Sequence, residues 1–363
     1  MSRSSQTTHV KSGKLSSAVC TRLTSLIAGL ADECILRVRR GSTWWEGSNR
    51  AWAGPTTFAY QTHAFRTASI SKTFTAALVL LLVEEGVLSL DDRLTTYLSN
   101  EICDQIHIYE GHSFGSDITI AQLLRHRSGV FDYATTAQFI EGVFDTPAKK
   151  WSALDLLRVA IRAGTPYFRP DEGVAYSDTG YVLLALIIEA ATGSSLASVY
   201  RERLLDPLAL KRTYLEGCET ATEWPVAHAF SGKTDTANFD PSFDTFGGGG
   251  LVSTAADLDH FITSLLGQAV FANEETLQFM KLGTDGPVGT GTRKTRTAAG
   301  ISLFSISDTL FWGHLGHWNS FMLRSLETDI VICGTFNQAN DDPRYKQILE
   351  AAVSESLSWD VNK

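Results

Sequence analysis

The sequence predicts an α/β fold in which one sheet is built from both ends of the chain around a mostly helical middle. Three observations support this prediction. Alternating, β-rich runs occur near the start, within residues 34–45. Similar runs return within residues 300–336. Between them, roughly from Thr73 to Glu216, apolar residues recur mostly at helical spacing.

These patterns divide the chain into a split α/β domain and an inserted helical domain. We place the α/β domain at residues 18–75 and 240–363, and the helical domain at residues 76–239. Residues 1–17 are polar and rich in Ser, Thr and Lys, so we expect a flexible N-terminal tail. The tail contains no apolar core of the kind that a secretory signal needs.

The first elements are a helix and a hairpin. Residues Ala18–Leu30 have the apolar spacing of an amphipathic helix. Cys34–Arg39 alternates in polarity, and Arg40-Gly41-Ser42 then turns the chain into Thr43-Trp44-Trp45. This arrangement predicts a β-hairpin.

The middle of the chain contains the clearest helix patterns. They are Ile118–Arg125, Ala153–Ala163, Tyr181–Thr192 and Ser195–Leu205. Gly193 follows the third pattern, where a helix-terminating glycine is expected. We expect the segment from about Gln105 to Lys150 to be able to form one wall of a substrate cleft.

Strands dominate the last part of the chain. The run Phe246–Thr254 predicts a glycine-rich turn and a short strand, and Thr254 is placed to cap a helix at Asp257–Leu266. Four strand-like runs and a closing amphipathic helix follow: Gly300–Ser305, Thr309–Gly313, Ser320–Ser325, Asp329–Phe336 and Gln347–Leu357.

Composition excludes several classes of protein. The chain has 363 residues, 44% hydrophobic and 20% charged, which is typical of a globular protein. Its net charge of −9 argues against binding to nucleic acid or to an anionic membrane. The apolar stretch Leu78–Val83 is too short to span a bilayer. The five cysteines are scattered without metal-ligand spacing, so we expect reduced, buried thiols and a cytoplasmic location.

Ser69-Ile70-Ser71-Lys72, at the front of an apolar run, is the strongest candidate for catalysis. Ser69 is the only serine with a lysine three positions later. A serine hydroxyl needs a base within hydrogen-bond reach, and a helical spacing of three brings Lys72 to the same face. The helix N-terminus adds N–H groups where an oxyanion would form. The alternative interpretation makes Ser69 a helix cap and Lys72 a solvated first-turn residue.

A second candidate group is Tyr176-Ser177-Asp178, directly before a predicted helix. A tyrosine phenol can transfer a proton if a neighbouring cation lowers its pKa, and Lys72 is a candidate for that cation. Alternatively, Tyr176 only covers a loop and Asp178 caps the helix.

The third group, Gly313-His314-Leu315-Gly316-His317-Trp318, lies on a predicted strand. A glycine there lets a substrate backbone approach closely, and the backbone N–H of His317 is a candidate oxyanion donor. On a strand, an odd separation would place His314 and His317 on opposite faces. With no obvious third ligand, we expect no metal site.

In this order, the three motifs resemble those of the penicillin-recognising serine hydrolases. The branch holding class C β-lactamases, DD-carboxypeptidases, D-aminopeptidases, D-amino-acid amidases and related esterases is the most similar. Residues 65–72, 118–129, 207–210 and 249–254 also match segments of that family. The resemblance runs from about Cys34 to Asn337. It implies a β-lactamase/transpeptidase-like fold, with an antiparallel sheet flanked by helices and a mostly helical inserted domain.

The resemblance also implies a role for each matching residue. Ser69 would be the acylated nucleophile, and Lys72 would activate it. Tyr176 would assist as general base and donate a proton to the leaving group. The backbone N–H groups of Ser69 and His317 would form the oxyanion hole, and His314 would shape the electrostatics beside Tyr176. No metal or organic cofactor is implied.

The second motif departs from the family pattern, because Asp178 stands where asparagine is commoner. A carboxylate in contact with Lys72 would favour the ammonium form and make the lysine a poorer base. Proton abstraction would then fall more heavily on Tyr176, unless Asp178 is turned away.

The third motif departs as well. Relatives that bind a free substrate carboxylate often carry threonine or serine beside the glycine, whereas Leu315 and His317 flank Gly316 here. This weakens the case for a DD-carboxypeptidase or a β-lactamase. Trp318 suggests an apolar or aromatic acyl pocket, although simple core packing explains it as well.

The sequence therefore predicts a serine hydrolase that forms an acyl-enzyme on Ser69 and cleaves amide or peptide bonds, D-amino-acid compounds included. A carboxylesterase acting on small esters is the nearest alternative, followed by a β-lactamase or an acyltransferase. A non-catalytic ligand-binding homologue is the alternative from a different class. The expected partner is a small-molecule amide, peptide or ester.

Overall fold

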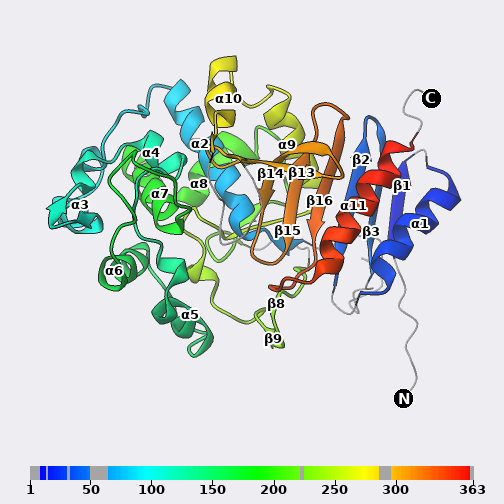
Figure 1. The fold of residues 1–363 in the computed structure, drawn as a ribbon, viewed down its shortest axis with the longest axis horizontal. Coiled ribbons are helices and arrows are strands. Elements are labelled where there is room, and N and C mark those ends of the chain that lie inside the picture. Colours follow the sequence, from blue (N-terminus) through cyan, green and yellow to red (C-terminus); the bar gives the residue numbers. More distant parts are fainter. Residues whose placement is uncertain are drawn as a thin grey trace.

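One antiparallel sheet of nine strands organises the part of the chain that the computed structural model describes, residues 9–13, 15–30, 33–49, 64–220, 225–285 and 296–359. The strands, in spatial order, are β1 (His9–Gly13), β3 (Thr43–Ser48), β2 (Ile35–Arg40), β16 (Ile330–Thr335), β15 (Ser320–Arg324), β14 (Thr309–Leu315), β13 (Ser302–Ile306), β12 (Arg296–Thr297) and β11 (Thr284–Asp285). Because β2 pairs with β16, both ends of the chain complete one sheet. The predicted fold class is confirmed (Figure 1).

The N-terminal hairpin forms as predicted, but the sheet extends beyond it. Arg40 pairs with Thr43 across the turn. Residues 9–13, expected to belong to a flexible tail, instead form the edge strand β1 on the outer side of β3. Their pairing provides hydrogen-bond partners for an edge that the hairpin alone would leave open.

Helices cover both faces of the sheet (Figure 1). On one face, α1 (Ser17–Ala28) and α11 (Pro343–Leu357) pack together over an apolar cluster that includes Trp45. On the other face, α9 (Ala255–Leu266) lies against β15 and β16. Phe261 of α9 stacks on Phe74 of α2 (Ser71–Glu84), with ring centroids 3.7 Å apart. Helix α2 is therefore buried in the larger hydrophobic core, and α10 (Glu274–Lys281) packs beside α2.

The remaining helices form the side of the molecule away from β1 (Figure 1). They are α3 (Asn100–Ile106), α4 (Ile120–Leu124), α5 (Ala137–Phe144), α6 (Ala153–Ala163), α7 (Asp178–Thr192) and α8 (Leu196–Tyr200). Thr119 begins α4 with a capping box, and Gly193 ends α7 at φ 66°. The predicted helix Ser195–Leu205 changes character at Arg201, where a π-helical turn replaces the α-helix. The domain boundaries given above stay a prediction.

Short strands connect these parts. A second sheet joins β4 (Phe65–Arg66), β10 (Leu251–Ser253) and β7 (Tyr214–Leu215). Two small hairpins pair β5 (Ile108–Tyr109) with β6 (His112–Ser113), and β8 (Phe230–Ser231) with β9 (Thr234–Asp235).

The cysteines are free thiols, and three of them, Cys34, Cys103 and Cys333, are buried. Cys218 is exposed, so the expectation of buried thiols is wrong at that position.

Within the described ranges, no single helix has both the length and the apolarity to cross a membrane. Only α7 and the following Leu196–Leu205, bent by 81°, meet both criteria when they are taken together.

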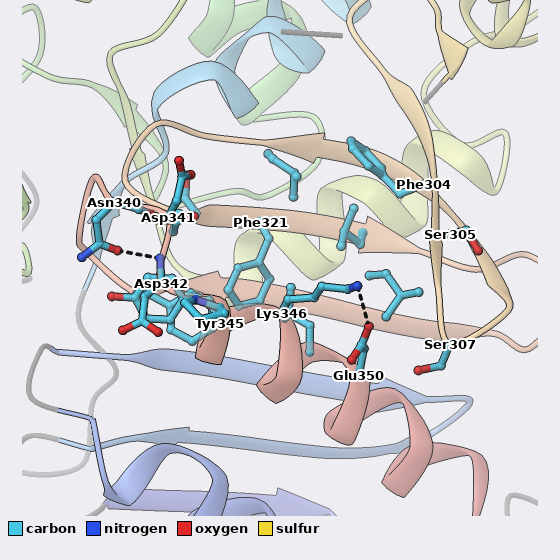
Figure 2. A pocket seen from close by; sticks show the side chains of 18 of the residues that line it. Phe304, Ser305, Ser307, Phe321, Asn340, Asp341, Asp342, Tyr345, Lys346 and Glu350 are labelled. Carbon is cyan, nitrogen blue, oxygen red and sulfur yellow. Dashed lines mark hydrogen bonds and ion pairs between the residues drawn. The ribbon is translucent and has the colours of Figure 1, made fainter. Parts of the chain in front are cut away.

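A hollow of about 720 Å³ lies between α11 and the sheet (Figure 2). Phe304 and Phe321 of the sheet and Tyr345 of α11 line it. Leu315, which the sequence analysis placed beside the site glycine, also faces this hollow. Among the described residues, none of the predicted site residues lines it.

Candidate active site

Ser69 lies in a tight turn rather than at a helix cap. It occupies the 3₁₀ turn Ala68–Ile70, which leads directly into α2. The preceding residue, Ala68, has φ 48°, a left-handed conformation that is unfavourable for alanine. No side chain caps either the turn or α2. The capping interpretation of Ser69 is therefore wrong, and Ser69 instead lines a hollow.

Neighbouring hydroxyl groups hold this strained turn. Thr67 Oγ1 donates to the carbonyl oxygen of Leu251 at 2.8 Å and lies 3.0 Å from Ser71 Oγ. Because the threonine proton is used on the carbonyl, Ser71 is the donor to Thr67. Ser71 Oγ in turn accepts the N–H of Leu251 at 3.1 Å. Ser320 Oγ donates to the Thr67 carbonyl at 2.8 Å, which ties the turn to β15.

Lys72 is completely buried and uses its ammonium protons on three acceptors. Its Nζ donates to Ser69 Oγ at 3.1 Å and to the Gly248 carbonyl at 2.7 Å. The third acceptor is Asp178 Oδ1, so Lys72 and Asp178 form an ion pair. Gly248 leaves room for this pair, because a Cβ would lie 2.8 Å from Asp178 Oδ1 and displace it. The interpretation of Lys72 as a solvated residue is wrong.

The ion pair decides the charge of Lys72. Burial by itself lowers the pKa of the ammonium, but Asp178 and then Tyr176 outweigh burial and raise the pKa above its ordinary value. Asp178 can make this contact because Ser177, not Asp178, caps α7, with its hydroxyl accepting the N–H of Gly180 at 3.3 Å. Lys72 is therefore an ammonium in the free protein at neutral pH.

Tyr176 lies over the lysine, with its ring centroid 4.9 Å from Lys72 Nζ. The pKa of the Tyr176 phenol is not lowered, as the sequence suggested, but raised. Burial raises the pKa of the phenol, and Asp178 raises it further, so the lowering effect of Lys72 is outweighed. Tyr176 is thus a neutral phenol in the free protein, where the sequence suggested a lowered pKa.

Two neutral imidazoles flank Tyr176. His126 stacks on its ring at 4.5 Å, and Nδ1 of His126 accepts the N–H of Ser177 at 3.2 Å. The ring of His314 lies 6.3 Å from the Tyr176 ring, with Nδ1 2.7 Å from the Leu315 carbonyl. Since a carbonyl only accepts, Nδ1 of His314 carries the proton and Nε2 is an acceptor. Burial and the Lys72 charge lower the pKa of His314 to about 4, and burial lowers that of His126 well below its usual range.

His317 lies beyond the end of β14, so the alternation of faces that would place it opposite His314 does not apply to it. The strand ends at Leu315, and the turn that follows breaks the alternation of faces. His317 lines the hollow at Ser69, and His314 lies beside Tyr176. Within the described ranges, no group of three or more His, Cys, Asp or Glu side chains is arranged to hold a metal ion.

Gly316 allows β14 to approach the nucleophile turn. A Cβ at this position would lie 2.3 Å from the Thr67 carbonyl oxygen and 2.1 Å from Ser320 Oγ. In addition, the pairing of β13 with β14 stops at Gly313, so the residues beyond it have no partner on that side in the described register.

A hollow of about 470 Å³ opens above Ser69. Its walls are mostly apolar and come from the segment predicted to form one wall of the cleft and from residues far along the chain. The lining side chains include Tyr133, Phe139, Ile140, Val143, Phe144, Phe239, Phe243 and Trp318. Trp318 is buried against Ala68 and Ala229 and also lines the hollow, so core packing is confirmed and its part in an acyl pocket stays a prediction.

Sequence reasoning missed two carboxyl groups at the site, Asp132 and Asp244. Asp132 is buried and accepts the N–H groups of Asp178 at 3.1 Å and Ala134 at 3.2 Å. Asp244 lines the hollow. Burial, together with the charge of Asp178, raises the pKa of each to about 7. Neither lies in a recognisable motif, whereas His126 lies in segment 118–129, which matches the family, and its place in the sequence gives a signal for it.

Fold and site together indicate the class of serine hydrolases with a Ser-x-x-Lys nucleophile, and comparison with known families agrees. Residues 35–355 match the family described as Beta-lactamase. The chain therefore belongs to the beta-lactamase family.

Two curated relatives match parts of the chain. Penicillin-binding protein 4* of Bacillus subtilis is 36% identical over 149 residues, which is 41% of this chain and 30% of the relative. Unguisins hydrolase of Aspergillus violaceofuscus is 26% identical over 239 residues, 62% of this chain and 40% of the relative. The chain thus spans less than half the length of these curated relatives.

Solved structures match over nearly the whole chain. A D-stereospecific amidohydrolase from Streptomyces sp. superimposes with a TM-score of 0.78 at 26% identity, covering 93% of this chain and 98% of that one. The D-amino acid amidase of Ochrobactrum anthropi SV3, complexed with D-phenylalanine, gives a TM-score of 0.76 at 23% identity, covering 94% and 99%. The second likeness supports the fold alone.

Proposed function

We propose that this protein hydrolyses amide bonds of small molecules through an acyl-enzyme on Ser69, with D-amino-acid amides or peptides as the leading substrate class. The observation that carries the proposal is the contact between Ser69 Oγ and Lys72 Nζ at 3.1 Å, on the floor of an apolar hollow. The likeness to a D-stereospecific amidohydrolase over 93% of the chain supports the choice of substrate class.

Proton transfer is assigned to Lys72 and Tyr176 acting as a coupled pair. Both are protonated in the free protein, because Asp178 and burial raise the pKa of each group. Attack by Ser69 therefore requires the pair to lose one proton, and the protonation state belongs to the pair rather than to either residue. The remaining positive charge of Lys72 stabilises the developing alkoxide.

The tetrahedral intermediate needs donors for its oxyanion. We assign this role to the backbone N–H groups of Ser69 and His317, two residues that line the same hollow. The C–N bond then breaks as Tyr176 gives a proton to the leaving amine, which leaves the acyl group on Ser69. A water molecule, deprotonated by the same pair, releases the acid and restores the serine. Neutral His314 keeps additional positive charge away from Tyr176.

The site argues against penicillin and C-terminal carboxylate substrates. In the relatives, a free substrate carboxylate is bound by hydroxyl side chains beside the glycine that corresponds to Gly316. The residues beside Gly316 are Leu315, which faces the hollow under α11, and His317, whose pKa burial lowers. We therefore place amide hydrolysis ahead of β-lactam hydrolysis.

The test is a hydrolysis panel with trapping of the acyl-enzyme. It contains D- and L-amino-acid amides, p-nitrophenyl esters, a D-Ala-D-Ala peptide and nitrocefin, with Ser69→Ala as the control. A fluorophosphonate should add one adduct, located on Ser69 by mass spectrometry, and amide turnover should vanish in Ser69→Ala. A folded protein that forms no adduct and hydrolyses no amide would refute the proposal. Turnover of esters alone would assign the site to an esterase.

A further inference from the structure

We infer that Asp178 and Asp244 make the hollow at Ser69 select substrates by charge. The preferred substrate carries an ammonium group close to the scissile carbonyl and an apolar side chain on the acyl part. This inference rests on the proposed function and adds a specificity determinant, Asp244, to it.

The charged side chains that face the hollow are anionic. Among its described lining residues, Asp178 and Asp244 are the only Asp, Glu, Lys or Arg. The guanidinium of Arg66 lies near Asp244 but makes its hydrogen bonds to other groups. It donates to both oxygens of Glu216, at 2.7 Å and 2.9 Å, and to the Thr236 carbonyl at 2.8 Å. A substrate anion would meet no free cation among these groups, whereas a substrate cation would meet two carboxyl groups.

The site holds more carboxyl groups than its single ammonium can neutralise. Lys72 is paired with Asp178, while Asp132 and Asp244 interact with the same two groups. Burial and repulsion by Asp178 raise the pKa of Asp132 and Asp244 to about 7, so the lowering effects of Lys72 on both groups and of Arg66 on Asp244 leave each carboxyl group without a full counterion. A bound ammonium would supply that counterion.

The geometry places the cation near the reacting carbon. Asp178 contacts Lys72, and Lys72 contacts Ser69 Oγ at 3.1 Å, so the carboxylate lies within two hydrogen bonds of the nucleophile. An ammonium that pairs with Asp178 is then only a few bonds from the acyl carbon that Ser69 attacks. An α-amino-acid amide or ester has this spacing.

Asp244 is held in position by its surroundings. Its backbone N–H donates to the Pro241 carbonyl at 3.1 Å and ends the 3₁₀ turn Pro241–Phe243. Its carboxylate rests against Gly249, where a Cβ would lie 2.1 Å from both carboxylate oxygens. The glycine therefore provides the space that Asp244 occupies at the wall of the hollow.

The rest of the hollow suits an apolar side chain. Phe139, Ile140, Val143 and Phe144 come from α5, and Phe239 and Phe243 come from the chain before the glycine run. A volume of about 470 Å³ is in the range of small-molecule sites. In an aromatic amino-acid amide, the ammonium group would lie near the carboxyl groups and the ring would lie against the apolar wall of the hollow.

Binding to the Ser69→Ala variant tests the inference independently of turnover. The probes are phenylalaninamide, in both chiral forms, and 3-phenylpropionamide, which differs by lacking the amino group. We expect at least one form of phenylalaninamide to bind about 10- to 100-fold more tightly, because a charge-assisted interaction in a partly buried site is lost in the other probe. Adding Asp244→Asn should reduce this ratio at least tenfold and leave 3-phenylpropionamide binding unchanged.

The control for the substitution is Glu141→Gln, an exposed carboxylate on α5 outside the hollow, which should leave the ratio unchanged. Thermal denaturation and 3-phenylpropionamide binding report whether Asp244→Asn is folded. Equal affinity for the two probes, no binding of either at millimolar concentration, or a ratio that survives Asp244→Asn would overturn the inference. Absence of turnover in the unsubstituted protein, with the binding preference intact, would overturn only the proposed hydrolysis.

Discussion

Replacing Asp178 by asparagine should change the pH at which the enzyme becomes active. In the native protein, Asp178 is the main group that keeps buried Lys72 in its ammonium form. Asparagine keeps the size of the side chain and an oxygen acceptor but removes the negative charge. Burial, which lowers the pKa of an ammonium, then becomes the dominant influence on Lys72.

The magnitude follows from the contact. An opposite charge within hydrogen-bond distance changes a pKa by about one to three units, or about 1.4 to 4 kcal/mol. The pair formed by Lys72 and Tyr176 should therefore lose its proton at a pH lower by about one to three units in Asp178→Asn. The rising limb of the plot of kcat/KM against pH should move to lower pH by the same interval.

The assay is kcat/KM for one amide substrate measured from acidic to alkaline pH, in parallel with the rate of fluorophosphonate labelling of Ser69. The matched control is Asp104→Asn, an exposed aspartate, whose profile should coincide with that of the native protein. Superimposable profiles for Asp178→Asn and the native protein would refute the reasoning. A limb that moves to higher pH would mean that Asp178 itself accepts the proton.

Three further outcomes follow from the site. Burial and Asp178 raise the pKa of Asp132 to about 7. The contribution of Asp132 to the free energy of unfolding is therefore greatest below about pH 4 and is lost as the pH rises to about 7. In chemical denaturation, Asp132→Asn should reduce this loss of stability by about 1 to 3 kcal/mol. Gly316→Ala would place a Cβ 2.3 Å from the Thr67 carbonyl oxygen, so we expect about 1 to 3 kcal/mol of destabilisation and at least tenfold lower kcat/KM, and unchanged kinetics would contradict the close approach. Phe139→Leu shortens a wall of the hollow, and the ratio of kcat/KM for phenylalaninamide over alaninamide should fall about five- to tenfold; an unchanged ratio would remove this residue from the acyl pocket.

The sequence was sufficient for the fold and for the centre of the site because both depend on local patterns. Strand alternation at the two ends predicted the sheet that β2 and β16 complete. The spacing of Ser69 and Lys72 is a helical spacing, so their contact is a short-range consequence of the chain. The aspartate at position 178 raised the question of a contact with Lys72 without settling it, and the structure shows the ion pair.

What the sequence did not reveal depends on contacts between distant residues or on the end of an element. Asp132 and Asp244 come together at Lys72 only through tertiary packing, and each looks like an ordinary turn residue in the chain. The strand was expected to include His317, but β14 ends two residues earlier, because strand boundaries are set by neighbours rather than by local preference. The direction of the Tyr176 pKa depends on burial, which no motif encodes.

The pairing of β2 with β16 has a consequence for how the protein acquires activity. The hairpin is synthesised early, but its inner edge finds its partner only after residues 330–335 have been made. Closing such a long loop is slow, and until it closes an unpaired strand edge is exposed to association with other chains. The turn at Ser69 depends on hydrogen bonds to Leu251 and Ser320, both of which are made late. During refolding, helical structure should therefore appear first and reactivity toward a serine probe last, and a chain cleaved within the inserted helices should regain that reactivity only if its two pieces re-associate.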